Sequence, residues 1–128
     1  MNCRIDSAGN LTFTVIEPKT ISGISGTVSQ EGGRLTFDQQ VLAFELLAEG
    51  QVTPVSAPWL LIRTLRSGYL RSCCKENEQF RITIDDSYQE DALQLDIWTD
   101  DEGRPVRGEI LWQGRRVLSL DVRKFVYL

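Results

Sequence analysis

The C-terminal half of the chain alternates apolar and polar residues, and this period of two constrains the fold most strongly. In the segment ALQLDIWT, Leu93, Leu95 and Ile97 alternate with Gln94, Asp96 and Trp98, as in a β-strand that buries one face. The same period runs through QFRITID, PVRGEILW and the start of RRVLSLDVRKFVYL. Gln113-Gly114 is a pair that closes two-residue hairpins, so these strands are predicted to form an antiparallel meander.

The N-terminal half shows weaker strand signals. The segment 10–16 (NLTFTVI) alternates, and Glu31-Gly32-Gly33 predicts a hairpin turn between two short strands because paired glycines supply positive φ. Residues 40–47 (QVLAFELL) predict another strand, although their pattern also tolerates a helix. Residues 69–74 (YLRSCC) predict a short strand.

Between these halves the period changes to that of a helix. Leu61, Ile62, Leu65 and Tyr69 recur at helical spacing. Ser56 can cap the start, Pro58 suits the first turn and Gly68 suits the end. The sequence therefore predicts one helix over 56–67 among seven or eight antiparallel strands, an α+β fold with a twisted sheet.

Length and charge limit the class of protein. The chain has 128 residues, 41% of them hydrophobic, which predicts a single domain over 1–128 with one core. Its formal net charge is 14 − 18 = −4 and its basic residues are dispersed, so nucleic acid is not an expected partner. No apolar run approaches the roughly 20 residues of a membrane span. Because the sequence begins almost directly in a strand, we expect truncation at the N-terminus.

Three cysteines, Cys3, Cys73 and Cys74, are predicted to be buried free thiols. A bridge from Cys3 to one of the adjacent pair is the alternative, since neighbouring cysteines rarely bond to each other. Zinc would need a fourth ligand, and the chain has no histidine. The sequence predicts no metal site and no cofactor.

The absence of histidine also removes the commonest general base and the nucleophilic triads that use it. The acidic run Asp100-Asp101-Glu102-Gly103 is interpreted as a turn between strands, and the run 85–92 as a solvated loop. Catalysis would need carboxylates such as Asp85 and Asp101 to be brought together. We therefore predict that the protein is not an enzyme.

The tryptophans, Trp59, Trp98 and Trp112, leave two interpretations open. Core packing is favoured, because large aromatic side chains bury much area. The alternative is that Trp59, together with Leu61, Ile62 and Leu65, covers a concave sheet face and lines an apolar cavity.

The segment from Asp86 to Phe125, read after the helix PWLLIRTLRSGYL, resembles LolA-like (LppX-like) lipoprotein-carrier proteins, and more nearly uncharacterised lipoproteins of Gram-positive clostridia. The matching positions are mostly turn and core residues: Trp98, Asp100, Gly103, Pro105, Val106, Trp112, Gln113, Gly114, Arg115, Leu118, Leu120, Val122 and Phe125. They are more informative about fold than about activity.

This resemblance implies a curved antiparallel sheet that forms a half-open β-barrel, with one main helix packed on its concave face. It also implies an extracytoplasmic setting, either as a membrane-anchored lipoprotein whose lipid anchor lies outside this sequence or as a secreted protein. The chain is shorter than a full carrier and has one lid helix. These departures predict a smaller cavity and exposed strand edges that can pair with a second copy as a homodimer.

Two functions follow from these expectations. In the first, the protein is a non-catalytic cell-envelope domain that binds a lipid, an acyl chain or another apolar ligand between helix and sheet. The predicted groove is lined by Trp59, Ile62, Leu65, Leu95, Ile97, Ile110 and Trp112. In the second, it is a structural or protein-interaction domain with a filled core, which uses a sheet edge or the face carrying Trp98 to dimerise or to dock a partner.

Overall fold

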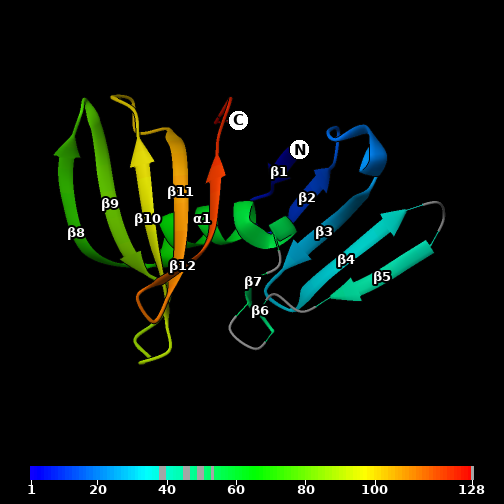
Figure 1. The fold of residues 1–128 in the computed structure, drawn as a ribbon, viewed down its shortest axis with the longest axis horizontal. Helices are drawn as coiled ribbons and strands as arrows, with labels where there is room; N and C mark the ends of the chain where they lie inside the picture. The colour runs from blue at the N-terminus through cyan, green and yellow to red at the C-terminus, as the bar shows by residue number, and fades with distance from the viewer. Residues whose placement is uncertain (38–39, 45–46, 49–50, 53, 128) are drawn as a thin grey trace. The chain divides into compact units, whose positions relative to one another are not determined.

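The computed structural model describes residues 1–37, 40–44, 47–48, 51–52 and 54–127. Their contacts group the chain into two compact units, Met1–Trp59 and Leu60–Leu128. Each unit contains one five-stranded antiparallel sheet (Figure 1). The single domain over 1–128 stays a prediction.

The first unit is built on a sheet with strands in sequence order. The strands are β1 (Asn2–Ile5), β2 (Leu11–Thr14), β3 (Ser25–Ser29), β4 (Gly32–Phe37) and β5 (Gln40–Phe44), and a single 3₁₀ turn, η1, spans Lys19–Ile21. In β2, Leu11 and Phe13 are buried while Thr12 and Thr14 are exposed, which confirms the predicted alternation.

A short connecting region separates the two sheets along the chain. It contains the two-stranded ribbon of β6 (Leu47–Ala48) and β7 (Gln51–Val52), then the 3₁₀ turn η2 (Pro54–Ser56) and the helix α1 (Ala57–Ser67). The helix ends where the Gly68 amide donates a hydrogen bond to the Thr64 carbonyl, 2.8 Å away. The predicted helix is thereby confirmed, starting one residue later than expected. Among the described residues, no helix has the length and apolar character needed to cross a membrane.

The second unit carries the strands that the alternation predicted most clearly. They are β8 (Tyr69–Glu76), β9 (Gln79–Asp85), β10 (Leu93–Thr99), β11 (Pro105–Trp112) and β12 (Arg115–Asp121), and each pairs with the next. Gln113 and Gly114 both have positive φ, 51° and 77°, as the two central residues of a type I′ turn require. The predicted hairpin at this position is confirmed.

The helix packs directly on this second sheet at two glycines. A Cβ atom on Gly108 of β11 would lie 2.6 Å from the Leu61 Cδ1 atom. A Cβ atom on Gly68 would lie 2.3 Å from Ile84 Cγ2 and 2.6 Å from the Thr64 carbonyl oxygen. Because Leu61 and Ile84 are both buried, these missing side chains let the helix approach the sheet and fill the core.

The predicted α+β fold, with seven or eight strands in one curved sheet forming a half-open barrel around a main helix, is wrong: the described residues form twelve strands and one short α-helix, and the structure is mostly β. Strands β1 to β5 form one five-stranded sheet, and strands β8 to β12 form a second one. Alternation identifies a strand and its buried face, but it does not say which strand pairs with which. The region predicted as one strand over 40–47 contains β5 and the first residue of β6, and positions 45–46 lie outside the described residues.

The prediction of buried thiols is also wrong. Cys3, Cys73 and Cys74 are all free and exposed. Cys3 lies on β1 and the adjacent pair on β8, and both strands are at the edge of their sheets. All eight residues of β8 and the first three residues of β1 are exposed, so neither face of these segments is covered.

We expect Gly68→Ala to destabilise the protein by about 1–3 kcal/mol, because the new methyl group meets backbone as well as a side chain. Gly108→Ala should cost less, since the blocking atom is the end of a flexible leucine. Urea unfolding of both variants beside the wild type measures the difference, with the exposed Ser119→Ala as the control. A larger loss in Gly108→Ala than in Gly68→Ala would contradict this account of the packing.

Candidate interaction face

The face of the second sheet that carries the polar positions of the alternating strands is organised around Trp98. In the strand register, Trp98 lies opposite Arg81 of β9 and opposite Arg107 of β11. The guanidinium carbons of these arginines lie 5.4 Å and 5.7 Å from the indole centroid, within the range of cation–π attraction. The name Trp98 face is used below for the surface formed by Arg81, Thr83, Asp96, Trp98, Arg107, Glu109 and Arg116.

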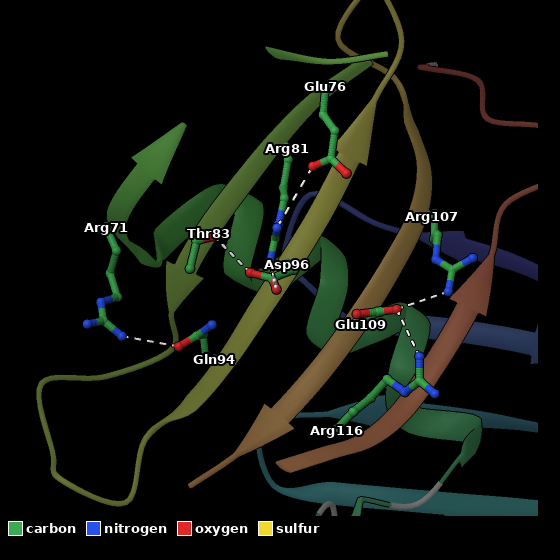
Figure 2. A network of polar contacts seen from close by, with 9 residues as sticks. All are labelled: Arg71, Glu76, Arg81, Thr83, Gln94, Asp96, Arg107, Glu109 and Arg116. Carbon is green, nitrogen blue, oxygen red and sulfur yellow. Dashed lines mark hydrogen bonds and ion pairs between the residues drawn. The ribbon is translucent and has the colours of Figure 1, made fainter. Parts of the chain in front are cut away.

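Asp96 fixes the β9 side of this face (Figure 2). Its side chain is 3% exposed; Arg81 Nη2 donates to Oδ2 and the Thr83 hydroxyl donates to Oδ1, each across 2.8 Å. The hydrogen bond and the charge of Asp96 raise the pKa of Arg81, so the guanidinium remains charged. The two hydrogen bonds hold the arginine in one orientation beside the indole ring.

Glu109 fixes the β11 side in a similar way. It lies directly opposite Asp96 in the register, and its Oε1 atom accepts hydrogen bonds from Arg107 Nη2 at 2.9 Å and Arg116 Nη1 at 3.1 Å (Figure 2). Two carboxylates that face each other across strands would repel, but each has its own guanidinium partner. One oxygen of each carboxylate, Asp96 Oδ2 and Glu109 Oε1, is bonded to arginine, an arrangement that suits a structural role better than proton transfer.

One donor in this network lacks a hydrogen-bond partner among the described residues. Arg81 Nε is buried and has no hydrogen-bond partner among the described residues. A buried donor without a partner costs about 1–3 kcal/mol.

Nearer the β8 edge, a second polar cluster extends the charged surface. Arg71 Nη1 donates to the Gln94 side-chain oxygen at 3.1 Å, and its Nε atom lies 3.6 Å from Asp85 (Figure 2).

Across the part of the chain that the structure describes, no group of three or more cysteine, aspartate or glutamate side chains is placed to hold a metal ion.

The sheet residues of the predicted groove do share one face. Leu95, Ile97 and Ile110 are almost completely buried on the side of the second sheet that meets the helix. Trp112 lies on the same side by register, opposite Leu93, and is half-buried.

The predicted helix residues are placed differently. Ile62 and Leu65 are only half-buried, and the buried helix positions in the second unit are Leu60, Leu61 and Thr64. Trp59 belongs to the first unit, where its indole N–H donates to the Gly9 carbonyl across 2.8 Å. The buried helix face could have been predicted from the small and apolar residues at positions 57, 60, 61, 64 and 68, which recur at helical spacing. The last two of these, Thr64 and Gly68, pack closely against each other.

The acidic run that follows β10 forms the predicted turn. Asp100 Oδ1 accepts the backbone N–H groups of Glu102 at 3.0 Å and Arg104 at 2.9 Å, and Oδ2 accepts Arg104 Nε at 2.9 Å. These hydrogen bonds, that from the Arg104 backbone first, lower the pKa of Asp100.

In the other acidic run, over 85–92, Asp86 joins the two ends of the loop by a hydrogen bond. Its Oδ1 atom accepts the Leu93 amide across 2.8 Å, while burial raises the pKa of its carboxyl group. Asp85 pairs with Gln94 at the start of β10, whereas Asp101 follows the end of that strand. Asp85 and Asp101, the example of a carboxylate pair given above, therefore lie at opposite ends of β10.

Comparison with known proteins gives a likeness of fold. No protein-family model matches the chain, and no curated protein matches it significantly. A solved structure, described as the CwlD amidase from Clostridioides difficile in complex with the GerS lipoprotein, contains a chain that is similar to this one with a TM-score of 0.55. The two are 15% identical over 93% of this chain and 69% of that chain. The resemblance to LolA-like carriers stays a prediction.

Removing Arg81 should destabilise the protein more than removing Arg116. Arg81→Met leaves the buried Asp96 carboxylate without its cation, a loss of about 1–3 kcal/mol, whereas in Arg116→Met the Glu109 carboxylate keeps Arg107. Chemical denaturation of both variants measures the difference. Equal losses would show that the Asp96 pair does not organise this face.

Two carboxyl groups should titrate on opposite sides of the usual aspartate value of about 3.9. The pKa of Asp86 is raised, so its contribution to stability is lost as the pH rises above the unfolded value toward the folded one. The pKa of Asp100 is lowered, so its contribution is present above the unfolded value and is lost as the pH falls. Carboxyl ¹³C chemical shifts followed against pH measure both, and midpoints in the reverse order would refute the assignment.

Proposed function

We propose that this chain is a non-catalytic protein-interaction domain that docks a protein partner with its Trp98 face. The observation that carries the proposal is the placement of Trp98 between Arg81 and Arg107, with both arginines anchored by carboxylates. Tryptophan and arginine are the residues most enriched at the energetic centres of protein interfaces.

Preorganisation supports this assignment. The side chains of Arg81 and Arg107 are 39% and 44% exposed, so their outer surfaces are available for contact. Their hydrogen bonds to Asp96 and Glu109 hold them in place before a partner arrives, and this reduces the entropy lost on binding. Flexible arginines on an open surface would lack that advantage.

The packing of the opposite face supports protein docking over lipid binding. Leu61 lies over Gly108, and Leu95, Ile97 and Ile110 are almost fully buried. A core filled in this way leaves little space for an acyl chain between helix and sheet. The solved structure with the similar fold is a complex of two proteins, which also favours a protein partner.

The proposed setting is the cell envelope. The proposal draws on the resemblance to lipoprotein carriers and on the lipoprotein named in the similar complex. In that setting the domain would present the Trp98 face to another envelope protein.

Quantitative affinity capture from native cell extract tests the proposal. A partner retained by the wild-type domain should bind Trp98→Ala with a loss of about 2 kcal/mol, or roughly thirtyfold in affinity. Tyr88→Ala is the matched control, because Tyr88 is an aromatic residue with 85% exposure on the loop after β9. Retention of the same proteins by wild type and Trp98→Ala would contradict the proposal.

A separate measurement distinguishes protein docking from lipid binding. Delipidated protein titrated with a fluorescent fatty acid should show no saturable uptake, since the helix and sheet meet at Gly108. Saturable uptake that Ile110→Trp abolishes would overturn the proposal in favour of the predicted groove.

A further inference from the structure

The two five-stranded sheets have four edge strands, and one of them differs in chemistry from the rest. The edges are β1, β5, β8 and β12. Arg4 lies on β1, Arg71, Lys75 and Glu76 lie on β8, and Arg115, Arg116 and Asp121 lie on β12, whereas β5 has the sequence QVLAF and carries no charge. Charged side chains are the usual protection of an edge strand against pairing with another chain.

The β5 edge is also apolar on both faces. Val41 is 62% exposed and Leu42 is 64% exposed, and consecutive residues of a strand point to opposite faces. Phe37, at the end of the neighbouring strand β4, is 51% exposed. In Figure 1, β5 is the outermost strand of the first sheet. Its outer backbone groups and its exposed apolar side chains form a ready template for a further strand.

We propose that β5 pairs in antiparallel fashion with β5 of a second copy, so that two first sheets join into one. A two-fold axis at the centre of the strand places Leu42 opposite Leu42 of the copy and Val41 opposite Ala43. Every such pair is uncharged, and β-branched and aliphatic neighbours across strands are favourable. No charged side chain on β5 selects a partner of opposite charge, and its own sequence provides the complementary apolar strand.

In one of its two central registers, the same operation is unfavourable at β8, the longest edge strand. If β8 paired with its copy about Cys73, Arg71 would face Lys75 across the junction, and like charges directly opposite each other are destabilising. Leu70 on β8 is 67% exposed, so exposure alone does not separate the two edges. The difference lies in charge.

β5 belongs to the first sheet, whereas the Trp98 face belongs to the second. The net charge of −4 on each copy adds a repulsion that salt screens. The dimer should therefore tighten as ionic strength rises, whereas an interaction based on opposite charges would weaken.

Sedimentation velocity over a range of protein concentrations tests the proposal. The wild-type chain should show a concentration-dependent dimer, and Leu42→Lys should raise its dissociation constant at least about tenfold, because the two lysines meet at the axis. Leu70→Lys is the matched control and should leave the dimer unchanged, as should Trp98→Ala. Circular dichroism checks that each variant is folded. A monomer at all concentrations, or a dimer that Leu42→Lys leaves intact, would overturn the proposal.

A cross-linking experiment keeps the test decisive if Leu42→Lys fails to fold. The three exposed native cysteines are replaced by serine, and Leu42→Cys is added to that background. Mild oxidation should give a covalent dimer, since residues opposite each other on antiparallel strands lie within the Cα separation that a disulfide spans. Leu70→Cys in the same background should remain largely monomeric. Equal cross-linking at both positions would contradict pairing through β5.

Discussion

Asp96 is a carboxylate buried on the polar face of the second sheet, and Arg81 and Thr83 donate hydrogen bonds to both of its oxygens. The Arg81 side chain is 39% exposed, so water screens the pair and its net contribution to stability is small, but removing Arg81 would leave the buried Asp96 carboxylate without a cation. The pair therefore acts mainly as a positional constraint. It sets the orientation of Arg81, and through Arg81 it sets one side of the cation–π contact with Trp98.

The two faces of the second sheet have different roles for physical reasons. On one face Gly108 and Gly68 let the helix approach so closely that aliphatic side chains fill the space beneath it. On the other face long polar side chains lie across the strands and pair with one another, leaving the indole of Trp98 half-buried between two cations. The face that packs against the helix stabilises the second unit, and the Trp98 face is the surface that we propose a partner recognises.

Much of the local structure could be predicted from the sequence, because alternation over 93–99 and 105–112 and the pair Gln113-Gly114 are local signals. The division into two sheets could not, since alternation does not specify the pairing partner of a strand. The neighbours of Trp98 were missed for the same reason. Arg81 and Arg107 stand at polar positions of their strands, but only the register brings both beside the indole ring. The thiols of Cys73 and Cys74 were predicted to be buried, but all eight residues of β8 are exposed, and the sequence does not indicate that both faces of this strand are uncovered.

The most direct test of the Trp98 face is a comparison of its solvent accessibility inside cells and in the purified protein. Hydroxyl-radical footprinting followed by mass spectrometry reports the oxidation rate of each aromatic side chain. If the face docks a partner, Trp98 should be oxidised several-fold more slowly in cells than in the purified chain, while the exposed Tyr88 should react at similar relative rates in both. Equal oxidation of Trp98 in the two settings would contradict the account.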